Sequence, residues 1–319
     1  MIRKNSAPKA VSKLRGQKSS SGTLISSPSQ TLRSVDRVLP AHPTLEGEGF
    51  LVHRPFPAPG MLHLDPFLML DEMGPAVLPP GEAKGAPNHP HRGFETVTYL
   101  LEGEAEHHDS QGNHGVLRPG DVQWMTAGRG VIHSEMPSEK FQREGGRMHG
   151  FQLWVNLPRV DKMMKARYQE IPSKKIPEVV LAGGLARAKV IAGAVGDGVS
   201  VIETRVPIQY VDFDLQEGAE IRQPAPQNHT AFAYVYEGQG SFGADAAGQE
   251  LRVERGHLVL FAHDGDLISA RATGPEGLRF LLLSGQPIGE PIAQFGPFVM
   301  NTQAELEQAF WDFQSGHFL

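Results

Sequence analysis

The chain has 319 residues, including 36 glycines and 25 prolines, and it contains no cysteine. This composition predicts a turn-rich, all-β architecture of two domains, and it excludes disulfide bonds and thiolate metal sites. The net charge is −6, yet the first 35 residues carry seven Lys or Arg and no acid, so the remainder is acidic and a poor match for direct binding of nucleic acid.

Residues 1–35 are also rich in serine and poor in aromatic side chains. Such a composition cannot bury enough apolar surface to offset the entropy of ordering, so we expect a flexible tail. An organellar transit peptide or a basic docking arm has the same signature and remains the alternative. No apolar run reaches the length needed to cross a bilayer, which favours a cytoplasmic protein without a membrane partner.

Short strand candidates separated by turn signals follow from Val38 to about Pro158. They are FLVHRPFP, ETVTYLLEGE, VLRPGDVQWMTAG, GVIHSEM and MHGFQLWVNLP, with polar breakers at SQGN, RPGD and AGRG. This spacing predicts a closed or sandwiched β-barrel. We assign residues 36–165 to this N-terminal domain.

A second region repeats the same pattern. TAFAYVYEGQGSF stands in the place of TVTYLLEGEAEHH, ERGHLVLFA in the place of RPGDVQWMT, and RFLLLSGQP in the place of GFQLWVNLP. The repeat predicts a second β-barrel of the same ancestry, to which we assign residues 166–319. Between the two repeats, PRVDKMMKARYQEIPSKKIP reads as a linker with one helical turn.

The C-terminal segment NTQAELEQAFWDF predicts a helix. Thr302 followed by Glu305 is a capping-box pattern, which marks a helix start. Leu306, Phe310 and Phe313 then fall on one helical face. We expect this helix to pack onto a barrel.

Two pairs of potential metal ligands occur in the N-terminal domain, each with a spacing of two residues. His89 and His91 flank Pro90, and side chains two apart in a strand point to the same face. His133 and Glu135 repeat the spacing on a later strand candidate. If the two strands are neighbours, three imidazole nitrogens and one carboxylate oxygen meet at one interior point. We therefore predict a mononuclear metal site.

These ligand types suit Fe(II), Mn(II), Co(II), Ni(II), Cu(II) or Zn(II), and the spacing does not separate these ions. Four protein ligands leave two positions of an octahedral ion open, which admits a substrate and dioxygen. One carboxylate on a divalent ion leaves a local charge of +1. That charge favours an anionic ligand such as an enolate.

Other polar side chains near these pairs have simpler interpretations. Glu95 lies four residues beyond His91, an even step that makes it a rival carboxylate, but we expect it to support the ligands or the fold instead. His107, His108 and His114 flank the SQGN turn and are interpreted as solvated loop residues.

The second barrel serves as an internal control for the metal site. A shift of 135 to 136 residues along the sequence places Pro224, Pro226, Ser269 and Arg271 at the four ligand positions. None of these side chains can rebuild the site. We therefore expect one metal per chain, in the N-terminal domain.

The stretches HPHRGFETVTYLLEGE, PGDVQWMTAGRGVIHSEMP, FQLWVNLP and GPFVMNT resemble the pirin family of the cupin superfamily. The likeness runs from about Val38 to Phe313 and implies two cupin-type β-barrel (jelly-roll) domains in tandem. It also implies that the first domain holds iron, for which we expect Fe(II) ahead of other divalent transition metals, through the following side chains: His89, His91, His133 and Glu135.

One departure from the general cupin pattern accompanies this resemblance. In other cupins the glutamate follows the histidine pair, at the place of Glu95, and an asparagine stands where this chain has Pro137. The shift of the carboxylate to Glu135 is itself similar to the pirins.

The resemblance leaves three functions open. Some pirins are similar in activity to quercetin 2,3-dioxygenase, animal members act as redox-dependent transcription cofactors, and some bacterial members bind metabolic enzymes. Our leading hypothesis is a flavonol-cleaving dioxygenase that takes a small aromatic anion and dioxygen, with Glu135 as both ligand and proton acceptor. The alternative is a non-enzymatic iron redox sensor with a protein partner, nuclear in the animal case. A storage bicupin with an incidental metal is the third reading.

Overall fold

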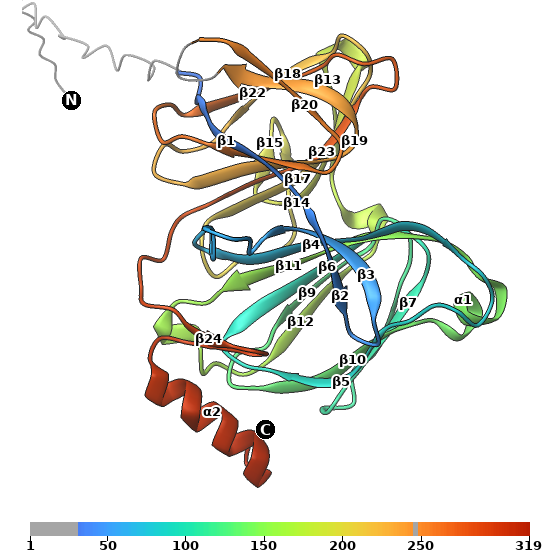
Figure 1. The fold of residues 1–319 in the computed structure, drawn as a ribbon, viewed down its shortest axis with the longest axis vertical. Coiled ribbons are helices and arrows are strands. Elements are labelled where there is room, and N and C mark those ends of the chain that lie inside the picture. Colours follow the sequence, from blue (N-terminus) through green and yellow to red (C-terminus); the bar gives the residue numbers. More distant parts are fainter. Residues whose placement is uncertain (1–30, 245–247) are drawn as a thin grey trace, which may run out of the picture. The chain divides into compact units, whose positions relative to one another are not determined.

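The computed structural model describes residues 31–244 and 248–319, which fold mainly into antiparallel strands (Figure 1). Most of the predicted N-terminal tail lies outside the described residues. The last residues of this tail are described. Arg33 is buried and donates hydrogen bonds to the carbonyl oxygens of Gln227 (2.8 Å) and His229 (2.7 Å). Residues 31–35 are therefore fixed against the folded chain.

Eleven strands form the N-terminal domain. Their bounds are β2 (His42–Glu46), β3 (Phe50–Phe56), β4 (Phe67–Leu78), β5 (Ala86–His91), β6 (Phe94–Glu102), β7 (Ala105–Asp109), β8 (His114–Leu117), β9 (Val122–Thr126), β10 (Val131–Pro137), β11 (Gly146–Asn156) and β12 (Arg167–Ile171). The larger sheet has the order β12-β9-β6-β11-β4-β3-β2, and the smaller one has the order β5-β10-β7-β8. The two sheets face each other as an open jelly roll.

Strand β6 is buried on both faces. Its side chains point alternately to the core shared with the second domain and to the interior of the jelly roll. Successive side chains of a strand point to opposite faces. Val97 and Tyr99 are fully buried in the core that continues into the second domain. Thr98 points the other way and donates a hydrogen bond to Glu135 on the smaller sheet. The jelly-roll interior therefore lies on the Thr98 side of β6.

The second domain is built around one ten-stranded sheet. Its strands are β1 (Val35–Pro40), β13 (Glu178–Leu181), β14 (Ala186–Ala192), β17 (Ile208–Leu215), β18 (Glu220–Pro224), β19 (Thr230–Ala244), β20 (Glu250–Glu254), β21 (His257–Phe261), β22 (Leu267–Ala272) and β23 (Leu278–Gly285). The short strands β15 (Ala194–Val195) and β16 (Gly198–Val199) form a hairpin. Strand β19 pairs with β21 and β23 as β6 pairs with β9 and β11, which is the correspondence that the sequence repeat predicts.

Two segments do not follow the predicted division at residues 36–165 and 166–319. Strand β1 lies in the first range but pairs with β21, with Val38 opposite Val259. Strand β12 lies in the predicted linker and second range but pairs with β9 of the first domain. The linker also contains two short 3-10 helices, with the bounds η1 (Arg159–Asp161) and η2 (Ser173–Lys175).

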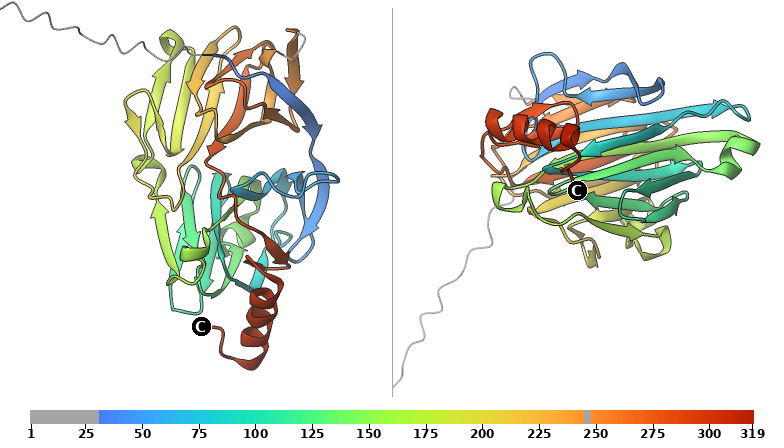
Figure 2. Two further views of the ribbon diagram at one scale, coloured as in Figure 1. Left: turned by 90° about the vertical axis from the view of Figure 1, so that its left-hand side faces the viewer. Right: turned by 90° about the horizontal axis from the view of Figure 1, so that it is seen from below.

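The C-terminal segment lies beside the N-terminal domain in both Figures 1 and 2. It consists of β24 (Ala293–Phe295), β25 (Phe298–Met300) and helix α2 (Gln303–Ser315). The N–H of Val299 donates to the carbonyl oxygen of Arg92, and the Arg92 guanidinium contacts Asp312 of α2 at 2.6 Å. These contacts attach the segment to the turn that follows β5.

Helix α2 confirms the capping box predicted at its start. Thr302 Oγ1 accepts a hydrogen bond from the Glu305 N–H, and the Glu305 carboxylate accepts one from the Thr302 N–H. Leu306 is buried, and Phe310 packs edge-on against Phe298. A second helix, α1 (Glu139–Glu144), was not predicted because it has less than two turns. Within the described residues, neither helix is long and apolar enough to cross a membrane.

Buried carboxylates join the two domains. Asp212 in β17 accepts hydrogen bonds from the hydroxyl groups of Tyr99 and Tyr236. Glu72 in β4 accepts one from the Tyr234 hydroxyl at 2.6 Å and lies 2.9 Å from His149 Nε2. Because buried polar groups without partners are costly, these fully bonded groups specify how the two sheets pack.

Candidate metal centre

Strands β5 and β10 bring three of the four predicted ligands together. The strands are antiparallel neighbours, with His133 opposite His89 and Val131 opposite His91. The imidazole ring centres are 4.4 Å apart for His89 and His133, 4.6 Å for His89 and His91, and 5.0 Å for His91 and His133. One nitrogen of each ring lies within 4.8 Å of the others. The predicted spacing therefore does produce a converging cluster.

Several nitrogens of this cluster have no hydrogen-bond partner among the described residues, and this tests whether the cluster suits a cation. His89 Nδ1 donates to the Pro87 carbonyl oxygen at 2.7 Å, which leaves Nε2 with a free lone pair. Both nitrogens of His133 and Nδ1 of His91 are buried without a hydrogen-bond partner among the described residues. Buried polar atoms normally have a partner, so these orphaned lone pairs fit a bound metal ion.

Burial also keeps the imidazoles of His91 and His133 in the neutral form that metal ligation requires. It lowers the pKa of His133 to about 4, against the attraction of Glu135, which raises it. It lowers the pKa of His91 well below the usual value, and the neighbouring imidazoles of His133 and His89 lower it further. The ring nitrogens are thus available as donors at neutral pH.

Glu135 lies beside the histidine cluster but is not part of the tight group of ligand atoms. A register shift in the β5–β10 pairing falls between His133 and Glu135 and places Glu135 opposite Ala86. Its two oxygens accept hydrogen bonds from Thr98 Oγ1 at 2.9 Å and from Gln152 Nε2 at 2.7 Å. The carboxylate is therefore oriented from the larger sheet.

The charge state of Glu135 follows from the same surroundings. Burial raises its pKa, but the imidazoles of His133 and His89 and the two hydrogen bonds outweigh burial and hold the pKa below the usual range. Glu135 is therefore an anion at neutral pH. Three neutral nitrogens with one adjacent carboxylate form a donor set that suits a divalent transition metal.

Sequence reasoning missed the two donors that hold Glu135. Thr98 comes from β6 and Gln152 from β11, and both are polar residues within otherwise buried strands. A polar side chain that faces the interior from such a strand needs a hydrogen-bond partner. A polar residue at an inward-facing position of the strand's alternating pattern therefore signals a buried contact. The sequence gives no information on which partner it finds.

A cavity of about 980 Å³ opens onto the cluster between the two sheets. This volume lies at the upper end of the usual range for small-molecule pockets. Its wall includes Met69, Met73, Met148 and Trp154, of which Trp154 lies beside His91, and the C-terminal segment contributes Pro297. The cavity is mainly apolar, but its wall also includes charged side chains away from the histidine cluster, among them Arg54, Asp71 and Lys84.

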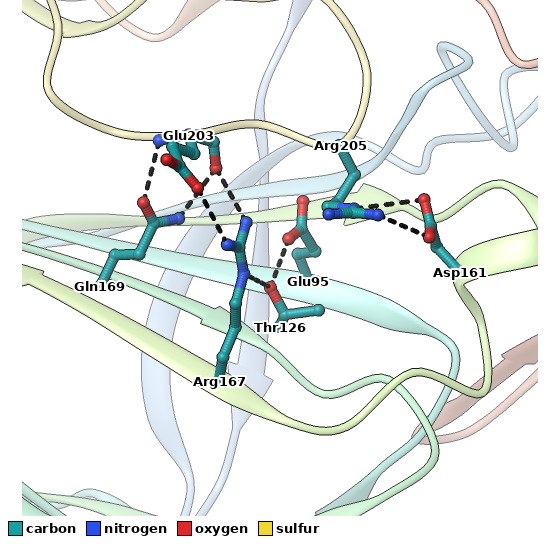
Figure 3. A network of polar contacts seen from close by, with 7 residues as sticks. All are labelled: Glu95, Thr126, Asp161, Arg167, Gln169, Glu203 and Arg205. Atoms are coloured by element: carbon teal, nitrogen blue, oxygen red, sulfur yellow. Dashed lines mark hydrogen bonds and ion pairs between the residues drawn. The ribbon is translucent and has the colours of Figure 1, made fainter.

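Glu95 is not close to the metal ligands, although its spacing made it a rival carboxylate. It lies on the opposite face of β6 from Thr98 and accepts a hydrogen bond from Thr126 Oγ1 at 2.5 Å. Figure 3 shows it beside Arg167 and Arg205. Burial raises its pKa to about 7, although the hydrogen bond from Thr126 and the two arginines lower it. Of the two roles expected for Glu95, the structure supports the one in the fold.

The spacing of four residues from His91 to Glu95 does not put the two side chains on one face, because the chain turns between them. Strands β5 and β6 belong to different sheets, and Gly93 between them has a positive φ of 89°. A side chain at this glycine would meet the Val299 carbonyl oxygen at 2.0 Å. The alternation of one strand therefore does not continue into the next.

His107 is not a solvated loop residue, so that prediction is wrong. It is 1% exposed, its Nε2 lies 2.5 Å from the Glu170 carboxylate, and its ring stacks on Tyr168. The reason is that β7 extends to Asp109, so His107 is a strand residue that faces the interior. His108 is exposed, as predicted.

The second domain has a matching strand pair, but the structure changes the expected counterparts. Strand β18 pairs with β22 as β5 pairs with β10, with Ser269 opposite Arg222 and Leu267 opposite Pro224. The counterparts of the first two histidines are therefore Arg222 and Pro224, two residues earlier than the sequence shift placed them. Arg222 donates to Glu220 instead of offering a lone pair.

Comparison with known proteins identifies the family to which this fold belongs. The family model described as Pirin matches residues 49–155, and the model described as Pirin C-terminal cupin domain matches residues 210–319. The chain belongs to the pirin family. The predicted tandem of two cupin domains with a C-terminal helix is thereby confirmed.

Relatives in this family cover most of the chain. A pirin-like protein from Solanum lycopersicum is 44% identical over 271 residues, which are 85% of this chain and 88% of the relative. Pirin from Homo sapiens is 42% identical, with the same coverage. A solved structure of quercetin 2,3-dioxygenase from Acinetobacter baumannii superimposes with a TM-score of 0.83 at 38% identity, covering 90% of this chain and 99% of that one.

Proposed function

We propose that this protein is a mononuclear metal-dependent dioxygenase that cleaves flavonol-type aromatic substrates such as quercetin. The observation that carries the proposal is the cluster of three imidazoles, His89, His91 and His133. Those of His91 and His133 are buried with unpartnered nitrogens, and His89 and His91 line a cavity of about 980 Å³. The similarity to a structure named quercetin 2,3-dioxygenase supports the substrate class.

The three imidazoles and Glu135 would hold the ion, and Fe(II) is our first choice. When bound, Fe(II) supplies a Lewis-acidic, redox-active centre with open positions for an anionic oxygen and for dioxygen. The neutral imidazoles leave the charge of Glu135 as the only protein charge on the ion. The resulting local charge of +1 favours a deprotonated hydroxyl group over a neutral one.

Glu135 is also the group placed to accept the proton of that hydroxyl. It lines the cavity, and both of its oxygens are held by neutral donors, Thr98 and Gln152. These donors fix the carboxylate in one orientation, so its free lone pairs face the space that a substrate would fill. Oriented carboxylates lose no conformational freedom at the moment of proton transfer.

The rest of the cavity suits a flat aromatic ring system. Trp154 offers an aromatic wall beside His91, with ring centres 5.3 Å apart. Met69, Met73 and Met148 provide polarizable side chains that adapt to the shape of a ligand. Such walls exclude water from the reacting hydroxyl and favour its anionic form near the ion.

Oxygen uptake tests the proposal directly. Protein purified without added metal should contain iron, consume dioxygen with quercetin, and lose this activity on metal removal. The variants His91→Ala and Glu135→Gln should be inactive, whereas Glu95→Gln, a carboxylate change on the opposite face of β6, should retain activity. Turnover that persists after complete metal removal, or in His91→Ala, would reject the proposal.

One observation favours the second candidate function, an iron redox sensor that binds a protein partner. Arg92 directly follows the ligand His91, and its guanidinium contacts Asp312 and the Phe318 carbonyl oxygen in the C-terminal segment. A change of charge at the ion would therefore act next to a surface helix. If quercetin is not consumed but partner affinity changes with the iron oxidation state, this function replaces the first.

A further inference from the structure

We propose that the outer face of the β7–β8 hairpin binds a second divalent cation of the Zn(II) type, through Glu106, His108 and His114. One ligand atom of each residue lies within 4.8 Å of the other two. The Nε2 atoms of His108 and of His114 are each 4.0 Å from the same oxygen of Glu106, Oε2. This site goes beyond the proposed oxygenase function and shares no ligand with the first cluster.

The pairing of the hairpin places all three side chains on one face. His108 in β7 is directly opposite His114 in β8, and Glu106 lies two residues before His108 on the same strand. The two imidazoles stack with ring centres 4.2 Å apart and planes at 21°. His107, between Glu106 and His108 in sequence, is buried and points to the interior instead. The three ligands therefore lie on the opposite face of the hairpin from His107.

The turn of the hairpin is fixed by its own hydrogen bonds. Asp109 accepts from the N–H groups of Gln111 and Asn113 at 2.9 and 2.8 Å, and from the Asn113 side-chain amide at 2.7 Å. These bonds hold the residues that join β7 to β8. The two histidines are thus kept opposite each other without any ion.

The carboxylate is also held in place. Oε1 of Glu106 accepts a hydrogen bond from the N–H of Glu139, at the start of α1, at 3.3 Å. This contact leaves Oε2 directed at the two imidazoles. A metal that binds one carboxylate oxygen and two imidazoles would meet a largely arranged set of donors.

The distances fit an ion after a small movement. Zinc bonds of about 2.0 to 2.2 Å at tetrahedral angles separate ligand atoms by roughly 3.3 to 3.5 Å. The observed 4.0 Å separations therefore need to shorten by roughly half an ångström, and the two stacked rings must also rotate so that both lone pairs point at one ion. His108 and His114 have half or more of their side-chain surface exposed, so both can move by this amount. Exposure also gives the ion direct access and leaves its fourth position to water.

A cation at this site would join the edge strand β8 of the smaller sheet to β7, which pairs with β10, the strand that carries His133 and Glu135. Strand β8 is the last strand of that sheet, and β7 lies between β8 and β10. Glu106 is opposite Met136, and His108 is opposite Ser134, the residue between His133 and Glu135. We therefore expect the bound ion to slow the opening of the hairpin.

Zinc titration of the protein with its first site already loaded with iron tests the proposal. Calorimetry should show one further equivalent of bound Zn(II), without release of iron. The double variant His108→Asn/His114→Asn should bind this equivalent at least about tenfold more weakly. The control variant His257→Asn/His317→Asn removes two histidines elsewhere and should bind like the wild type.

Two spectroscopic readouts identify the ligands themselves. Cu(II) added to the iron-loaded protein should show coupling to imidazole nitrogens that disappears in His108→Asn/His114→Asn. Hydrogen exchange at the amides of residues 109–113 should slow when zinc is added to the wild type, but not to this variant. Equal zinc affinity in the wild type and the double variant, or no second equivalent in the wild type, would overturn the proposal.

Discussion

Replacing Glu95 by glutamine should change how stability depends on pH. Burial raises the pKa of Glu95 to about 7, from an ordinary value of 4.5. Between these values the folded chain holds a proton that the unfolded chain has lost. The contribution of Glu95 to stability is therefore fully present below about pH 4.5 and is lost as the pH rises through about 7. The difference corresponds to about 3 kcal/mol.

Glutamine cannot ionise but keeps an oxygen that accepts the hydrogen bond from Thr126. The free energy of unfolding of Glu95→Gln, relative to the wild type, should therefore increase by about 3 kcal/mol between about pH 4 and about pH 8. Urea unfolding of both proteins at equal metal content measures this difference. The substitution can also change the free energy of unfolding by a constant amount, because the amide group packs differently from the carboxyl group. This constant cancels when the difference between the two proteins is compared across pH.

Two results would refute this reasoning. Parallel stability curves for the two proteins would mean that Glu95 titrates normally despite its burial. A weaker metal affinity in Glu95→Gln would mean that Glu95 supports the ligands, contrary to its position on the outer face of β6. The expected outcome is a changed stability curve with an unchanged metal affinity.

Three further substitutions test separate parts of the structure. Gln152→Leu removes a donor to Glu135 and should lower metal affinity by about 10- to 100-fold in equilibrium dialysis, because groups that orient ligands have effects of that size. Thr302→Ala removes the helix cap and should cost about 1 kcal/mol, measured by thermal unfolding. Asp312→Ala leaves the buried Arg92 guanidinium unpaired and should cost about 3 kcal/mol in urea unfolding.

Each of these has an outcome that contradicts the structure. Unchanged metal binding in Gln152→Leu would show that Glu135 is not a ligand or needs no orientation. If Thr302→Ala or Asp312→Ala left hydrogen exchange in α2 unaltered, the helix would not depend on its cap or on the arginine contact.

Local patterns in the sequence were sufficient to predict the repeated strands and the histidine cluster. Alternation within β5 placed His89 and His91 on one face, and the same rule applied to His133 on β10. These predictions depend on residues within one strand, where the period of two is a property of the backbone. The helix start at Thr302 was predictable for a similar reason, because a cap is formed by residues three apart.

Predictions that extended across a turn or from one sheet to another were less successful. The counting step from His91 to Glu95 passes Gly93, where the chain moves from one sheet to the other. The assignment of β1 to the first domain failed to anticipate its pairing with β21, because an edge strand takes whichever partner the tertiary structure brings to it. The burial of His107 was missed because the end of a short strand is poorly marked in sequence.

The two domains share a pairing pattern, yet they contribute differently to the candidate site. The second domain has Arg222 where the first has His89, and a cationic side chain there opposes binding of a metal ion. Its sheet instead packs on the outer face of β6, where Tyr99 donates a hydrogen bond to Asp212. Because side chains alternate along β6, fixing Tyr99 on one face also fixes Thr98 on the other, next to Glu135. The second domain therefore supports the candidate metal centre through the position of β6 and has no matching ligand set of its own.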